Sequence, residues 1–144
     1  MAYRINLRVY QANTETFFQI VEKTVWNYAN GGTWAEANGE QVLTMGGSGT
    51  SGTLRFVSTT GSSFLLALGV HNYKRWVDIQ PDPTKDQTAT VMHPSYYNAG
   101  TAQAEAREAQ RSTWTVQTAQ GQQVTVTCTQ EEGQHNLHAV LIIT

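Results

Sequence analysis

The stretch from residue 44 to residue 56 reads Thr-Met-Gly-Gly-Ser-Gly-Thr-Ser-Gly-Thr-Leu-Arg-Phe and decides the fold class. Gly47, Gly49 and Gly52 match the spacing of a dinucleotide-binding loop, but such a loop must lead into a helix whose N-terminus meets the pyrophosphate. Residues 53–57 instead alternate and are rich in β-branched and aromatic side chains, which predicts a strand. We therefore interpret the segment as a glycine-rich loop between two strands.

Alternation of apolar and polar residues also runs through other parts of the chain. It predicts strands at residues 3–9 and 124–128, each with one buried and one exposed face. Residues 64–70 are almost continuously apolar, which indicates a central strand covered on both faces. Asn38-Gly39 is a strong hairpin signal because both residues accept positive φ, so residues 40–45 should pair with the strand before them.

One region, from about residue 81 to residue 111, breaks this pattern. Asp82 resembles an N-cap followed by a proline, which predicts a short helix running towards Ala89. Residues 102–110 are strong helix formers and predict a second helix. Further strands are expected at residues 112–117, 122–130 and 137–143. The pattern predicts a mainly β fold of the α+β class: one domain over residues 1–144, two packed sheets, and helices over one edge.

The composition excludes several classes of protein. Charged residues make up 14% of the 144 residues, below the ~25% of an average soluble protein, and the net charge is −2. This charge gives no reason to expect nucleic acid or an anionic membrane as partner. No apolar run approaches the ~20 residues of a membrane span, and the N-terminal residues lack the apolar core of a secretory signal. Cytoplasmic residence is therefore expected, and the lone Cys128 forms no intrachain disulfide.

A second unusual segment, Gly69-Val-His-Asn-Tyr-Lys-Arg-Trp76, gathers amide, imidazole, phenol and indole groups. A sugar needs convergent donors and acceptors for its hydroxyls and an aromatic surface for its C–H face. Glycine lets a ligand approach the backbone N–H closely. The candidate polar groups are Ser48, the N–H of Gly49, His71 and Asn72, and the candidate ring platforms are Tyr28, Tyr73 and Trp76. Trp76 fits a core position better, because it lies in an alternating strand.

The same segments argue against catalysis. No Asp or Glu falls within either motif, so the paired carboxylates of a glycosidase are missing there. Neither Ser48 nor Ser51 completes the G-x-S-x-G of a serine hydrolase. His135 and His138 would lie on opposite faces of a strand, which disfavours a shared metal. The sequence therefore predicts a binding protein without enzyme activity, cofactor or metal.

Three motifs in order resemble the fungal fruit-body lectin family, the lectins of the common mushroom and bolete type. They are residues 27–34, residues 43–56 and residues 69–76. The Tyr96-Tyr97 pair also fits the family. The resemblance covers nearly the whole chain and implies a two-sheet β-sandwich with a short helix–loop–helix connection, similar to the actinoporins, the pore-forming toxins of sea anemones. The fold analogy leaves a membrane-active pore-former as the alternative function.

The family resemblance also implies which sugar the protein binds, how its chains assemble and what biological role it has. Its members are leaderless homotetramers that bind the T-antigen disaccharide, galactose β-linked to N-acetylgalactosamine, and act in defence against nematodes and insects. The expected partners are glycans and glycoproteins that carry these sugars, with no membrane insertion. The T-antigen site of the family maps onto Ala29, Ser48, Gly49, His71, Asn72 and Tyr73.

A second family site, for N-acetylglucosamine, is matched less completely. The resemblance assigns it to Asp78, Ile79, Gln103 and Trp114. Pro81 stands where a family threonine would supply a hydroxyl, and Gln103 stands where the family has an arginine. Trp114 replaces a tyrosine, which keeps a ring and loses a hydroxyl. These departures predict that the second site is not fully competent.

Overall fold

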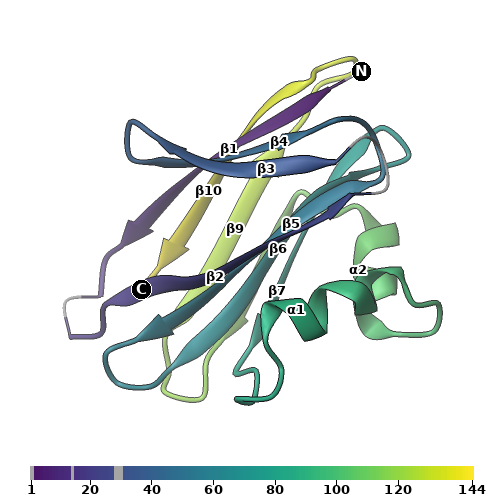
Figure 1. The fold of residues 1–144 in the computed structure, drawn as a ribbon. Helices are drawn as coiled ribbons and strands as arrows, with labels where there is room; N and C mark the ends of the chain where they lie inside the picture. Colours follow the sequence, from purple (N-terminus) through teal and green to yellow (C-terminus); the bar gives the residue numbers. More distant parts are fainter. Residues whose placement is uncertain (1, 14, 28–30) are drawn as a thin grey trace.

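The computed structural model describes residues 2–13, 15–27 and 31–144, in which ten strands form two stacked sheets (Figure 1). The six-stranded sheet has the order β3-β4-β1-β10-β9-β8, and the four-stranded sheet has the order β2-β5-β6-β7. The strands are β1 Tyr3–Gln11, β2 Phe18–Asn27, β3 Gly32–Ala37, β4 Glu40–Met45, β5 Thr50–Ser58, β6 Ser63–His71, β7 Lys74–Pro81, β8 Thr113–Gln117, β9 Gln123–Thr129 and β10 Asn136–Ile143. The expected mainly β sandwich is confirmed.

The two ends of the chain meet in the middle of the larger sheet. β1 pairs in parallel with β10, from Arg4 opposite Asn136 to Gln11 opposite Ile143, and antiparallel with β4 on its other side. Figure 1 shows the first and last strands side by side and running in the same direction. The N-terminal strand is therefore an interior strand of this sheet, with hydrogen-bonded neighbours on both sides.

The main core lies between the two sheets and follows the predicted period of two. Ile5 and Leu7 of β1 are fully buried, whereas Arg4 and Arg8 are exposed on the other face. Cys128 is a buried free thiol in this core. Cys128, at an inward-facing position of β9, therefore serves as a small apolar core residue.

β6 is buried on both faces, as its continuous apolar run predicts. Leu66 and Leu68 pack into the core between the sheets, whereas Leu65 and Ala67 face a second cluster that contains Trp76. Met92 and Tyr96 of the helical connection complete this second cluster, so the helices cover the outer face of the four-stranded sheet. The expectation that they lie over an edge is wrong.

The helical connection consists of α1 Ala89–Met92, the 3₁₀ turn η1 His93–Tyr97 and α2 Ala102–Ala109. The predicted second helix is confirmed. The predicted helix from Asp82 to Ala89 is wrong, because Asp82 has φ 51° and its carboxylate accepts the N–H of Ala119 instead of capping a helix. Thr88 is the N-cap, and its hydroxyl accepts the N–H of Val91 at 3.3 Å. In the described residues, no helix is long and apolar enough to cross a membrane.

A buried histidine attaches η1 to the sheet. His93 is 2% exposed, with Nδ1 2.7 Å from the hydroxyl of Thr24 and Nε2 2.8 Å from that of Ser51. The hydroxyl of Ser51 also lies 2.6 Å from that of Tyr97, whose ring stacks on Trp26 at 4.9 Å between centroids. Burial lowers the pKa of His93 from 6.5 to about 4, because the charged ring would lose its hydration.

Close contact between β5, β6 and β7 leaves no room for a side chain at Gly69. A Cβ there would lie 2.6 Å from Cβ of Ser51, 2.8 Å from Nε1 of Trp76 and 2.9 Å from the carbonyl oxygen of Thr50. We expect Gly69→Ala to lower the free energy of unfolding by about 1–3 kcal/mol or more, measured by urea denaturation. The control is Gly39→Asn, at an exposed turn with φ 78° and open space. Equal unfolding midpoints for the two variants would contradict this account of the packing.

Stability should fall on acidification because of His93. Above pH 6.5 the ring is neutral in both states, whereas between pH 6.5 and 4 the unfolded state binds the proton and the folded state resists it. At ~1.36 kcal/mol per pH unit, the loss is about 3 kcal/mol across this window. His93→Gln should be less stable at pH 7 but should lose this part of the pH dependence in chemical denaturation. Parallel stability curves for the two proteins would refute the assignment.

Candidate functional site

The predicted sugar-binding segment is the tip of the β6–β7 hairpin. His71 pairs with Lys74, so Asn72 and Tyr73 form a two-residue turn with φ 47° and 65°. Positive φ at both positions is the type I′ geometry of tight hairpins. Asparagine accepts this conformation readily, but tyrosine does so at a cost. The turn presents the Asn72 amide and a Tyr73 side chain that is 75% exposed.

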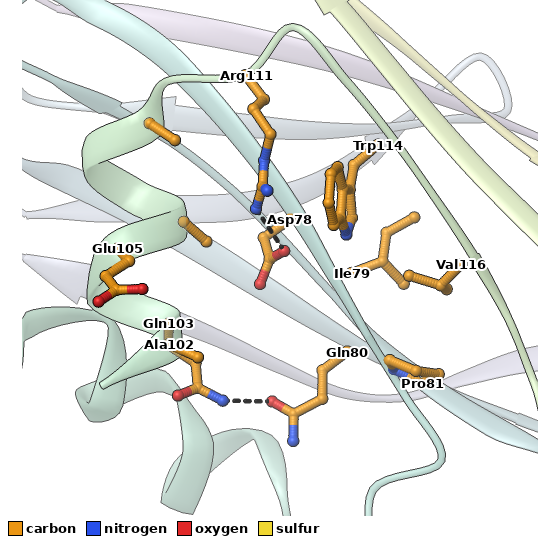
Figure 2. Close-up of a pocket in the computed structure, with 12 residues that line it drawn as sticks. Asp78, Ile79, Gln80, Pro81, Ala102, Gln103, Glu105, Arg111, Trp114 and Val116 are labelled. Atoms are coloured by element: carbon orange, nitrogen blue, oxygen red, sulfur yellow. Dashed lines mark hydrogen bonds and ion pairs between the residues drawn. The ribbon is translucent and has the colours of Figure 1, made fainter. Parts of the chain in front are cut away.

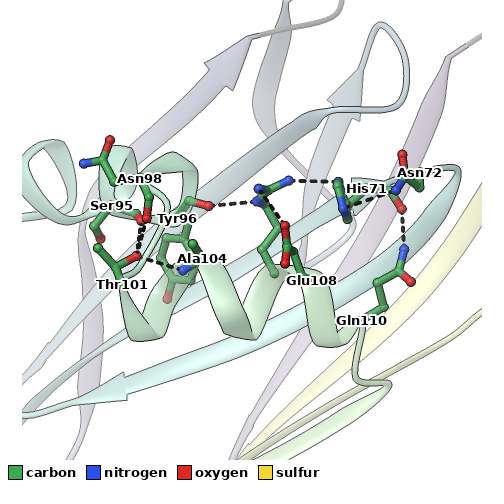
Figure 3. A network of polar contacts seen from close by, with 10 residues as sticks. His71, Asn72, Ser95, Tyr96, Asn98, Thr101, Ala104, Glu108 and Gln110 are labelled. Atoms are coloured by element: carbon green, nitrogen blue, oxygen red, sulfur yellow. Dashed lines mark hydrogen bonds and ion pairs between the residues drawn. The ribbon is translucent and has the colours of Figure 1, made fainter.

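Three side chains from other elements hold the backbone of this turn. The hydroxyl of Ser48 accepts the N–H of Tyr73 at 2.9 Å, and Gln130 Nε2 donates to the Tyr73 carbonyl at 3.3 Å. Gln110 donates its amide to the carbonyl of His71 (Figure 3). The glycine-rich loop, the end of the helical connection and the β9–β10 loop therefore fix one hairpin tip.

The structure brings most of the predicted first site together. Ser48 contacts Tyr73 directly, and Asn72 Nδ2 lies 3.4 Å from His71 Nε2. Gly49 differs from the expectation, because its N–H donates to the carbonyl of Val70 at 2.8 Å and so serves the fold. Ala29 and the candidate platform Tyr28 lie outside the described residues.

Arg107 determines which nitrogen of His71 carries the proton. Arg107 Nη1 lies 2.8 Å from His71 Nδ1, and its Nε donates to the Tyr96 carbonyl at 2.7 Å. A guanidinium can only donate, so Nδ1 accepts and the neutral ring carries its proton on Nε2. Burial and then the Arg107 charge lower the pKa of His71. The ring is therefore a neutral donor through Nε2, so its contact with Asn72 requires the amide oxygen, not Nδ2, to face it.

The four residues assigned to the second site line one hollow of about 600 Å³, beside α2 and between β7 and β8 (Figure 2). Asp78 and Ile79 come from β7, Gln103 from α2 and Trp114 from β8. Pro81, at the position of the missing hydroxyl, also lines it. Gln103 donates to the side chain of Gln80 at 3.0 Å. The residues at which this chain departs from the family pattern, Pro81, Gln103 and Trp114, thus all line the hollow.

Several polar groups of this hollow already have partners, although the buried Nε of Arg111 has no hydrogen-bond partner. Asp78 is 8% exposed, accepts the hydroxyl of Tyr96 at 2.7 Å and pairs with Arg111 at 3.3 Å. Burial raises the pKa of the Asp78 carboxyl. The Arg111 guanidinium lies 3.5 Å from the ring centre of Trp114, so it occupies one face of the indole. Arg111, which follows the C-terminal end of α2, thus places a positive charge in the wall of the hollow.

Sequence reasoning missed the residues that position the others. Arg107, Gln110 and Gln130 hold His71 and Tyr73 from segments 36 to 57 residues away in the chain. Their residue types carry no local signal for such contacts, because only the packed fold brings them near the hairpin. Trp76, in contrast, is buried against Tyr96 at 5.2 Å between ring centres, as its alternating position predicts.

Comparison with known proteins agrees with this fold. The sequence model of the family described as fungal fruit body lectin matches residues 1–141. The Boletus edulis lectin is 51% identical over 143 residues, which cover 99% of each chain. The crystal structure of the wild-type Xerocomus chrysenteron lectin is 52% identical, with a TM-score of 0.94 over 100% of both chains. A variant of that lectin with introduced methionines is 53% identical, with a TM-score of 0.94 over 100% of this chain and 99% of the other.

These matches define the class of protein as a carbohydrate-binding lectin without enzymatic activity. The chain belongs to the fungal fruit body lectin family. The resemblance stated from the three sequence motifs is therefore confirmed over the whole chain.

Removing Arg107 should change the protonation of His71 in a measurable way. In Arg107→Met the pKa of His71 should rise towards its ordinary value, because a nearby positive charge is lost, and the Nε2–H tautomer should no longer be enforced. Nitrogen-15 NMR of the imidazole, followed against pH, measures both effects. Arg8→Met, which removes an exposed cation paired with Glu40, is the control. An Nδ1–H tautomer in the unmodified protein would contradict the proposed contact.

Proposed function

We propose that this lectin binds the T-antigen disaccharide through Ala29, Ser48, Gly49, His71, Asn72 and Tyr73, of which His71, Asn72 and Tyr73 form the hairpin tip. The observation that carries the proposal is the rigid type I′ turn, which presents an amide, a neutral imidazole donor and an exposed ring together. These groups are polar but carry no fixed charge. They suit the hydroxyls and the C–H face of a neutral disaccharide.

A weaker second site for N-acetylglucosamine is proposed for the hollow that contains Asp78, Ile79, Gln103 and Trp114. Their placement around one hollow of about 600 Å³ favours it, since small-ligand pockets range over ~300–1,000 Å³. The existing pairing of Asp78 with Tyr96 and Arg111 opposes it. A ligand that binds the Asp78 carboxylate would compete with these existing partners, which lowers the net benefit, whereas the buried Nε of Arg111 has no partner and is free to donate.

We also propose that the protein is a homotetramer and acts as a multivalent agglutinin. Tyr10 and Ile142 are opposite one another in the β1–β10 pair and are 50% and 42% exposed, which makes this face suited to contact with another copy. Single shallow sugar sites bind weakly, and several sites on one assembly gain strength through avidity. Residence in the cytoplasm and a defence role against nematodes and insects complete the proposal.

Pore formation, the alternative drawn from the fold analogy, is opposed by the way β1 is held in the sheet. Actinoporin-like insertion needs an N-terminal segment that detaches. β1 is held between β4 and β10 in the middle of a sheet. Release of this strand would break both ladders and expose the core residues Ile5 and Leu7.

A glycan array tests the proposed specificity, and Asn72→Gly tests the site. Glycine keeps the positive φ of the turn and removes the amide, so the fold should survive. Loss of two hydrogen bonds, each worth about 0.5–1.5 kcal/mol, should weaken T-antigen binding by about 5- to 150-fold in calorimetry. Asn38→Gly makes the same change at another exposed turn residue, with φ 53°, and should bind normally.

Two results would overturn these proposals. An array without signal on T-antigen structures would reject the proposed ligand, and full affinity in folded Asn72→Gly would reject the proposed site. Signal on terminal N-acetylglucosamine should disappear in Trp114→Ala, with T-antigen binding unchanged, if the second hollow is used. Its persistence in that variant would place this binding elsewhere.

A further inference from the structure

A groove adjoins the hairpin tip and shares two lining residues with the proposed T-antigen site. Its central hollow, of about 330 Å³, is lined by Tyr3, Ser48, Tyr73, Gln130, Gly133 and His135. Ser48 and Tyr73 belong to the proposed T-antigen site. Of the other four, Tyr3 belongs to β1, and the remaining three lie in the loop between β9 and β10. The first site therefore opens directly into this hollow through two shared residues.

The hollow continues in both directions. A neighbouring hollow of about 370 Å³ shares Tyr73, Gln130 and Gly133 with it, and another of about 270 Å³ shares Tyr3 and His135. We refer to these three adjacent hollows as the groove; its outer parts also contain charged residues, Lys74, Glu131 and Glu132 on the hairpin side and Arg4 on the other. A ligand longer than a disaccharide can follow such a groove without leaving the surface.

The floor of the groove is aromatic. The rings of Tyr3 and His135 are stacked, with centroids 4.1 Å apart and planes 21° apart. Tyr3 is only 4% exposed, so the imidazole forms the outer layer of this pair, and Tyr73 adds an exposed ring at the hairpin side. Ring faces of this kind are suited to the C–H face of a pyranose.

The polar atoms of the central hollow are hydrogen-bonding groups of tyrosine, serine, glutamine and histidine side chains. His135 Nδ1 lies 3.0 Å from the carbonyl of Ala2, so it is the donor, and in the neutral ring Nε2 is an acceptor. The Ser48 hydroxyl accepts from Tyr73 and keeps its own hydrogen to donate. Gln130 is used by the fold, because it accepts the N–H of Arg75 and donates to Tyr73. The lining thus offers a donor and an acceptor to an uncharged, hydroxyl-bearing ligand.

We propose that this groove is an extension subsite, which binds the next neutral saccharide unit of a longer glycan whose disaccharide occupies the hairpin tip. The inference rests on the proposed function, since it needs a sugar at His71 and Asn72. The volume of the central hollow lies at the lower end of the ~300–1,000 Å³ range of small-ligand pockets, as suits one added unit. Specificity between long glycans is then set by His135, which lies outside the disaccharide site and is supported by the buried ring of Tyr3.

Calorimetry with the disaccharide and with neutral tri- and tetrasaccharides that extend it tests this subsite. The unmodified protein should bind at least one extended glycan about fivefold or more tightly than the disaccharide, as one or two added hydrogen bonds allow. His135→Ala should abolish this advantage and leave disaccharide affinity unchanged. His138→Ala is the matched control, because His138 is an exposed histidine of β10 outside the groove.

The outcomes separate the two proposals. Disaccharide binding without any advantage for extended glycans overturns the subsite alone, as does an advantage that survives in His135→Ala. No disaccharide binding overturns the proposed function and the subsite with it. The imidazole resonances of His135 in the unmodified protein give a check independent of mutation: they should shift with the extended glycan and not with the disaccharide. Unchanged resonances with the extended glycan would reject the subsite.

Discussion

The burial of β6 on both faces is the constraint on which the rest of the structure depends. One face closes the core between the sheets, and the other face receives Met92 and Tyr96 from the helical connection. Gly69 lets Trp76 and β5 approach β6 at a distance that excludes any side chain. Because this strand ends at His71, the same packing sets the position and direction of the hairpin tip.

The hairpin tip in turn obtains its chemistry from elements on either side. α2 carries Arg107, which leaves His71 neutral with its proton on Nε2, and Ser48 and Gln130 fix the backbone of Tyr73. A sugar site built this way is preorganised, since the turn conformation and the tautomer exist before any ligand arrives. The same α2 also lines the second hollow with Gln103 and Ala106, so one short helix borders both candidate sites.

Local sequence patterns predicted the elements whose conformation is determined by nearby residues in the chain. The alternation of β1, the apolar run of β6 and the helix formers of α2 each specify an element without outside help. Asp82 shows the limit of this reasoning. Its cap-like context before a proline was overridden by a contact with Ala119, far along the chain, and the helix begins at Thr88 instead. The residues that tune the site, Arg107 and Gln130 among them, act across sheets and loops, so no local pattern marks them.

The parallel pairing of β1 with β10 also constrains the order in which the molecule can form. β1 is synthesised first, yet one of its two neighbours is Asn136–Ile143, so the six-stranded sheet stays open until almost the whole chain exists. Contacts of such long sequence separation make folding slow, because the loop-closure entropy is lost before the contacts compensate for it. In the growing chain the hydrogen-bonding edge of β1 that will face β10 is unpaired, and an unpaired edge can pair with another chain. The newly made protein is therefore most exposed to aggregation just before its last strand is added.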